Sequence, residues 1–171
     1  MTRFEQTSTG CAPLDTSAPQ SSNQLDAHQV LAWARRSVAE LSRRRTELNK
    51  LNVFPVPDSD TGSNMTHTMA AAVAEAELGG DVAEALAIGS ARGARGNSGI
   101  VLSQVLRAVA DSTDNSVITA EDIVESLVLA VELVDKAIAQ PVEGTVVTVL
   151  RAAAHGAQAF VEKEHASTPS V

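Results

Sequence analysis

Apolar residues recur at helical spacing along most of this chain, and few of them are aromatic. Only 2% of the 171 residues are Phe, Trp or Tyr, although 44% are hydrophobic. Alanine, valine and leucine must therefore fill the interior, which favours closely packed helices over a β-sandwich. Trp33 and Phe160 are the predicted aromatic anchors of the core. The length is sufficient for one domain with a substantial core.

Breaks in this pattern divide the chain into six predicted helices with short links. Pro55 and Pro57 exclude both helix and central strand after the first helix, and Asp81 and Thr119 begin capping boxes for the third and fifth. The last helix is predicted although residues 146–149 favour a strand locally. The expected helices cover residues 26–50, 62–78, 82–92, 100–110, 120–139 and 145–163. An all-α antiparallel bundle is predicted, with a disordered tail over residues 1–25 and a polar tail over 165–171.

Two aspartates, Asp58 and Asp60, stand one residue apart directly before the second predicted helix. Carboxylates on a proline-stiffened loop are hard oxygen ligands suited to Mg²⁺, and a turn at Thr61-Gly62 would let both converge on one cation or on a close pair. Asn52 is a candidate neutral ligand. Aspartates also cap helices. Asp58 lies too far ahead of the helix for that role, whereas Asp60 could serve both purposes.

A glycine-rich turn, residues 93–99, precedes the fourth predicted helix. Glycines let the backbone approach an anion closely, and the following helix start presents free N–H groups. Asn97 and Ser98 add side-chain donors, and Arg92 and Arg95 could neutralise phosphate charge. Taken alone, the turn is better explained as a helix connector in which glycine provides the C-cap and Ser98 the N-cap. Beside the acidic turn, a phosphate site is the better interpretation.

Three familiar motifs do not fit. A calcium-binding EF-hand loop starting at Asp58 would need glycine where Ser63 stands and glutamate where Met69 stands. A haloacid-dehalogenase-type phosphatase needs its aspartate at the end of a buried parallel strand, which the prolines forbid. A Walker-type loop is absent, since no Gly-Lys-Ser or Gly-Lys-Thr occurs.

Composition limits the partners and the compartment. With 13 Lys and Arg against 21 Asp and Glu, the formal charge is −8, so nucleic-acid binding is not expected. The single cysteine, Cys11, excludes an internal disulfide. No apolar run approaches the roughly 20 residues that span a bilayer, and the polar N-terminus does not resemble an export signal. A cytoplasmic protein without membrane insertion is predicted.

Both turns belong to long motifs. The first reads Asn-Val-Phe-Pro-Val-Pro-Asp-Ser-Asp-Thr-Gly-Ser-Asn-Met over residues 52–65, and the second reads Gly-Ala-Arg-Gly-Asn-Ser-Gly-Ile-Val-Leu-Ser-Gln over residues 93–104. Together they resemble the nucleotide-binding (DhaL-type) domain of dihydroxyacetone kinases, and most closely the N-terminal kinase domain of bacterial fatty-acid kinases. Residues 141–145 resemble a third turn of that branch. The resemblance covers about residues 27–163.

The resemblance implies an eight-helix antiparallel barrel that holds ATP at one end with two Mg²⁺ ions. By position, Asp58 and Asp60 correspond to the metal ligands. The implied phosphate-lining residues are Gly62, Ser63, Asn64, Gly96, Asn97, Ser98 and Gly99, and Gly144 and Thr145 would lie nearer the nucleoside. Ser59 stands where the family usually has glycine, a change that is tolerable if its φ is negative. The dihydroxyacetone branch has a third aspartate near the place of Asn52, so the fatty-acid branch fits better.

The implied function is an ATP- and Mg²⁺-dependent kinase domain. Its acceptor would be a fatty-acid carboxylate on an acyl-binding partner protein, or a small ketose such as dihydroxyacetone. Six helices are predicted where the family has eight, so the alternative is a non-catalytic nucleotide-binding or interaction module. The sequence leaves a homodimer open.

Overall fold

The structure, a computed structural model, describes residues 24–53, 57–114, 117–139 and 144–167. Within these ranges the chain forms six helices and two very short strands. The helices are α1 (Ala27–Leu51), α2 (Thr61–Ala76), α3 (Val82–Gly93), α4 (Gly96–Asp111), α5 (Ala120–Ala137) and α6 (Val146–Ser167), and the strands are β1 (Gln24–Leu25) and β2 (Ile118–Thr119). The predicted all-α fold with six helices is confirmed.

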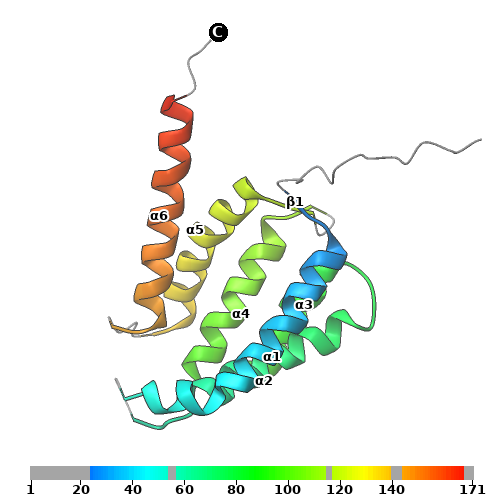
Figure 1. The fold of residues 1–171 in the computed structure, drawn as a ribbon, viewed down its shortest axis with the longest axis vertical. Helices are drawn as coiled ribbons and strands as arrows, with labels where there is room; N and C mark the ends of the chain where they lie inside the picture. The colour runs from blue at the N-terminus through cyan, green and yellow to red at the C-terminus, as the bar shows by residue number, and fades with distance from the viewer. Residues whose placement is uncertain (1–23, 54–56, 115–116, 140–143, 168–171) are drawn as a thin grey trace, which may run out of the picture.

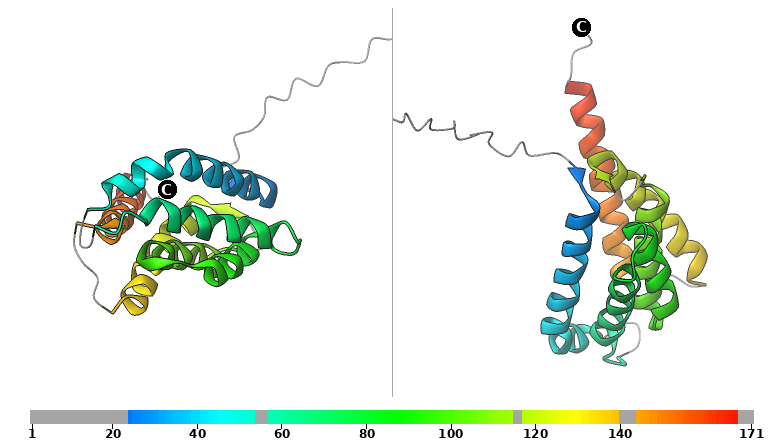
Figure 2. Two further views of the ribbon diagram at one scale, coloured as in Figure 1. Left: turned by 90° about the horizontal axis from the view of Figure 1, so that it is seen from below. Right: turned by 90° about the vertical axis from the view of Figure 1, so that its right-hand side faces the viewer.

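Each helix packs against the one before it in the chain, and α4 packs against α2 as well as α3. The helices α1 and α6 stand at the two ends of this series (Figure 1). In the described part of the chain these two helices do not pack against each other, so the six helices do not close into a barrel. The C-terminal part of α6 extends beyond the other helices (Figures 1 and 2).

Small side chains allow the helices to approach closely around two connected cores. One core joins α1, α2, α3 and α4, with Ala34, Met69 and Ala72 almost fully buried. The other joins α4, α5 and α6 around Ala108 and Val134. Because α4 contributes to both, it is the element that fixes the two halves relative to each other.

Some sequence predictions are wrong for residues on the outer helices α1 and α6 and near the two ends of the chain. Trp33 is 51% exposed and Phe160 is 65% exposed, because α1 is an end helix of the series and the last turns of α6 extend past the others. Gln24 and Leu25, expected in the N-terminal tail, pair antiparallel with β2. The helix α6 continues to Ser167, into the expected C-terminal tail. The predicted features at residues 1–23 (including Cys11), Pro55, residues 141–143 and residues 168–171 lie outside the described residues.

The side chains of the N-cap residues themselves cap α1, α3 and α5. Asp26 and Gln29 form a capping box at α1, and the predicted box of Thr119 and Asp122 is present at α5. Asp81 accepts a hydrogen bond from the Glu84 backbone N–H at 2.9 Å, which is one half of the box predicted for α3. In contrast, α2 and α4 begin without a side-chain bond from their own N-cap residues. These two helix starts, which lack a cap from their own N-cap residue, are those that follow or contain the acidic and glycine-rich motifs.

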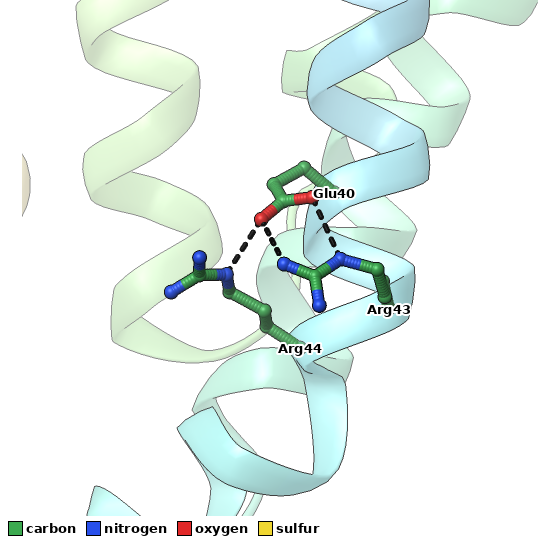
Figure 3. A network of polar contacts seen from close by, with 3 residues as sticks. All are labelled: Glu40, Arg43 and Arg44. Atoms are coloured by element: carbon green, nitrogen blue, oxygen red, sulfur yellow. Dashed lines mark hydrogen bonds and ion pairs between the residues drawn. The ribbon is translucent and has the colours of Figure 1, made fainter.

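An exposed ion-pair cluster on α1 provides a test of local electrostatics (Figure 3). The Glu40 carboxylate accepts hydrogen bonds from Arg43 at 2.6 and 2.9 Å and from Arg44 at 2.5 Å. The hydrogen bonds from Arg43 have the larger effect and that from Arg44 the smaller one, and together they lower the pKa of Glu40 from 4.5 to about 2. The same pairing raises the pKa of Arg43.

We expect the Glu40 carboxyl to titrate near pH 2 by NMR, and the double variant Arg43→Gln with Arg44→Gln to bring its pKa back towards 4.5. Because the folded-state pKa is lowered, the stabilisation is present above the unfolded value and is lost as the pH falls towards 2. The difference in Tm between the native protein and Glu40→Gln should shrink over that interval. A difference that persists unchanged at pH 2 would contradict the assignment.

Candidate functional site

The acidic loop bends at Ser59, between its two aspartates. Ser59 has a φ of +54°, a left-handed conformation that serine rarely adopts. The expected turn at Thr61-Gly62 is wrong, because both residues already belong to α2. The condition of a negative φ at Ser59 is likewise not met. Residues i and i+2 of an extended backbone lie on one face, and the convergence of Asp58 and Asp60 on one cation stays a prediction.

The strain at Ser59 leads to a stability prediction. Glycine adopts a positive φ without the steric cost that a Cβ brings. We expect Ser59→Gly to stabilise the fold by about 1 kcal/mol, measured as an increase in the free energy of unfolding in urea. Ser59→Ala, which keeps the Cβ, should not stabilise it. Equal gains from both variants would show that the hydroxyl group, not the backbone, is the source of the strain.

Asp60 occupies the N-cap position of α2, yet its carboxylate makes no capping hydrogen bond. The prediction that Asp60 could cap α2 is therefore wrong, and its role as a metal ligand stays a prediction. The cap comes from Asn49, near the end of α1: its Oδ1 accepts from the Ser63 N–H at 3.1 Å, and its Nδ2 donates to Ser63 Oγ at 3.0 Å. This replacement leaves the Asp60 carboxylate available for another partner.

Asp58 and Asn52 lie next to each other at the outer side of the loop. Asp58 is exposed, and Asn52 Nδ2 donates a short hydrogen bond to Asp58 Oδ1. Neither aspartate forms an ion pair within the described residues. Two unpaired carboxylates with an amide beside one of them match the donor set that Mg²⁺ accepts, since this ion usually takes one or two protein carboxylates and completes its shell with water and phosphate. In the described residues no site contains three or more His, Cys, Asp or Glu side chains.

The first turn of α2 is pressed against α1. A Cβ added to Gly62 would lie 2.6 Å from the Arg45 carbonyl oxygen and 2.8 Å from Leu48 Cβ. Real Cβ atoms do not come this close to backbone, so any larger residue would push the two helices apart. Helix packing therefore explains the glycine at position 62. This contact does not test the prediction that Gly62 lines the phosphates.

The same turn of α2 contacts the start of α4. Gly96, the first residue of α4, has a φ of +58°, and a Cβ there would overlap the side-chain amide of Asn64. One helical turn further along α2, the buried Thr68 lies with its hydroxyl 2.8 Å from the Asn64 carbonyl oxygen and 3.4 Å from that of Gly93. The acidic turn and the glycine-rich turn, about 30 residues apart in the sequence, are thus adjacent in the fold.

The start of α4 combines unsatisfied donors with an unpaired cation. The first-turn N–H groups of a helix have no intrahelical acceptor, and the N-cap residue Arg95 makes no capping bond. Asn97 is exposed, Ser98 is half-buried and Gly99 is buried within α4. Arg92 is held by Glu75 at 2.9 Å, whereas Arg95 has no ion-pair partner among the residues described. The sequence did not separate the two arginines, because their partners come from another helix.

The two residues predicted nearer the nucleoside, Gly144 and Thr145, lie just before α6. The Gly144 N–H donates to Thr148 Oγ1 at 2.8 Å, and Thr145 Oγ1 accepts from the Val147 N–H at 3.3 Å. The starts of α4 and α6 point towards the same, lower end of the molecule in Figure 1. Both residues have local structural roles at the start of α6, and their assignment to the nucleoside stays a prediction.

Comparisons with known proteins identify the family of this chain. Residues 55–171 match the DAK2 domain, a stretch that contains both turns. The chain belongs to the DAK2 (DhaL-type) domain family. This family is part of the dihydroxyacetone kinases, and its domains bind nucleotides. The link to a kinase family and to nucleotide binding therefore rests on both the motifs and the family match.

Similar proteins from two bacteria are much longer. The chain is 40% identical over 144 residues to protein YloV of Bacillus subtilis, which covers 81% of this chain and 25% of that protein. It is 41% identical over 129 residues to an uncharacterized protein of Staphylococcus aureus, covering 72% of this chain and 23% of the relative. This DAK2-family chain thus spans about a quarter of the length of these relatives. In the described residues no helix has the length and apolar character needed to cross a membrane.

Proposed function

We propose that this chain is an ATP- and Mg²⁺-dependent phosphotransferase domain whose phosphate site lies between the starts of α2 and α4. The observation that carries the proposal is the contact between two helix starts that lack their own side-chain caps, beside the unpaired carboxylates of Asp58 and Asp60. Helix N-termini attract anions and free carboxylates attract cations. A nucleotide triphosphate with its divalent metal satisfies both requirements at one place.

Each element has a definable task in this arrangement. Asp58 and Asp60, with Asn52 beside them, would hold Mg²⁺, which when bound neutralises phosphate charge. The N–H groups at Gly96, Asn97 and Ser98 and the amide of Asn64 would orient the phosphate oxygens. The Ser63 N–H is already engaged by Asn49, so Ser63 has a smaller share than was predicted. Positioning and charge neutralisation supply most of what phosphoryl transfer requires.

The acceptor that we favour is a fatty-acid carboxylate presented by an acyl-binding partner protein. A carboxylate is ionised at neutral pH and needs no general base. In the described loops at residues 57–60 and 94–95, the only candidate bases are Asp58 and Asp60, which are assigned to the metal. A ketose hydroxyl such as that of dihydroxyacetone would need a base, and it is the second candidate. A non-catalytic nucleotide-binding module is the alternative if no acceptor is phosphorylated.

Titration calorimetry with a non-hydrolysable ATP analogue tests the proposal directly. We expect binding of one nucleotide per chain in the presence of Mg²⁺ and much weaker binding in EDTA. Phosphorylation of a fatty acid should then be assayed with the full-length protein and its acyl-binding partner. Nucleotide binding without phosphorylation of either acceptor would favour the non-catalytic module, and the absence of binding with Mg²⁺ would refute the phosphate site.

The two arginines near the glycine-rich turn offer a matched pair of variants. Arg95→Gln should weaken binding of the ATP analogue about tenfold, since a hydrogen bond to a charged group contributes about 1.5 kcal/mol. Arg92→Gln, which removes an arginine already paired with Glu75, should change the Kd less than about twofold. Calorimetry at constant ionic strength measures both. Equal losses would mean that the arginines act only through the overall charge of the surface.

A further inference from the structure

A groove of about 1060 Å³ lies at the opposite end of α4 from the phosphate site. Its walls are the C-terminal end of α4, the segment leading into β2, most of α5 and the later part of α6. With a rise of 1.5 Å per residue, Asp111, which lines the groove at the end of α4, lies about 22 Å along this helix from Gly96. No lining residue of the groove belongs to the proposed phosphate site, so the inference below does not depend on the proposed function.

The groove is apolar at its floor and acidic at its rim. Val124, Val128 and Val161 are half-buried along the floor. Of its 15 lining residues six are Asp or Glu, and none is Lys or Arg. Three of these carboxylates are engaged: Asp111 with Arg107, Glu132 with Lys136, and Asp122 with the Thr119 N–H. The side-chain carboxylates of the other three residues, Asp114, Glu121 and Glu125, have no hydrogen bond or ion pair with the described residues.

The apolar and acidic residues form two parallel rows along α5. Val124 and Val128 are four residues apart, as are Glu121 and Glu125, so each pair occupies neighbouring positions on the helix surface. An extended or globular ligand has no reason to match two parallel rows. A helix laid along the groove would match them if it carried an apolar stripe flanked by lysine or arginine.

We propose that this groove is a docking site for a cationic amphipathic helix of a partner protein. Charge complementarity carries the choice of occupant, because the lining has six carboxylates and no cation. A second copy of the chain fits less well. Its basic helix α1 keeps Arg36, Arg45 and Lys50 without an ion pair among the described residues. However, its exposed large apolar residues, Trp33 and Leu51, are too far apart in the helix to form a stripe.

The probe is a fluorescein-labelled synthetic helix of leucine and lysine with an apolar stripe, and fluorescence anisotropy measures its Kd. We expect saturable binding that weakens as the salt concentration rises. The double variant Glu121→Gln with Glu125→Gln should raise the Kd about fivefold, and Val128→Ser should raise it about threefold. The control variant, Glu47→Gln with Glu84→Gln, removes the same charge from exposed positions on α1 and α3 and should leave the Kd unchanged.

Several outcomes would overturn the proposal. Equal weakening in the groove and control variants would mean that the peptide follows only the net charge of −8. Equally tight binding of a scrambled leucine–lysine peptide, or of spermine, would exclude recognition of an amphipathic helix. A dimer in sedimentation experiments that dissociates in the Glu121→Gln, Glu125→Gln variant would assign the groove to a second copy. Circular dichroism on each variant verifies that it is folded.

Discussion

Replacing Asp58 and Asp60 together by asparagine should abolish the effect of Mg²⁺ on nucleotide binding and lower kcat by at least about a thousandfold. Asparagine keeps the shape of each side chain and removes its charge, so the loop can keep its conformation while losing its attraction for a cation. Neither carboxylate caps α2 or pairs with a basic residue, so the fold has little reason to lose stability. Calorimetry with and without Mg²⁺ and a full-length activity assay measure the two effects.

The control for this double variant removes two charges elsewhere. Glu84→Gln with Glu162→Gln changes exposed carboxylates on α3 and α6 and should leave both Mg²⁺-dependent binding and turnover as they are. If the Asp58→Asn, Asp60→Asn protein still binds the nucleotide more tightly with Mg²⁺ than without it, the metal assignment is wrong. If the control loses as much as the test variant, the general acidity of the surface, not the loop, attracts the cation.

The second large effect is expected at Gly96. Alanine there would be held at a φ of +58° and would overlap the Asn64 amide. The backbone strain costs about 1 kcal/mol, and the overlap is with the end of the Asn64 side chain, which can rotate away, so we expect Gly96→Ala to lower the free energy of unfolding by about 1–2 kcal/mol. Because the Asn64 amide must turn away from the start of α4, nucleotide binding should weaken as well. Urea unfolding and calorimetry measure the two quantities.

Gly79 supplies a matched comparison for this substitution. Its φ is +103°, and no atom would lie within 4 Å of an added Cβ. Gly79→Ala should therefore show the cost of the backbone strain without the overlap, and without any loss of nucleotide binding. Should Gly96→Ala prove no more harmful than Gly79→Ala in either measurement, the close contact between the starts of α2 and α4 would be in doubt.

The sequence predicts the helices well because helical periodicity and the caps at Asp81 and Thr119 are local. It also predicts that the two motifs act together, since their residue types suit one ligand. That Asn49, and not Asp60, caps α2 could not be predicted from the sequence, because the cap depends on how α1 packs against α2. The exposure of Trp33 follows from the place of α1 at the end of the helix series, which no local pattern reveals. Likewise, Arg92 differs from Arg95 because it forms an ion pair with Glu75 of α2, a partner that the local sequence does not reveal.

The most direct test of the phosphate site is to replace Mg²⁺ by the paramagnetic ion Mn²⁺ and to record the backbone amide signals by NMR in the presence of the ATP analogue. We predict selective broadening of the signals of Asp58 and Asp60 and of the first turns of α2 and α4. Without the nucleotide this broadening should be weaker. Broadening centred instead on the acidic groove between α5 and α6, or an undisturbed acidic loop, would contradict the account.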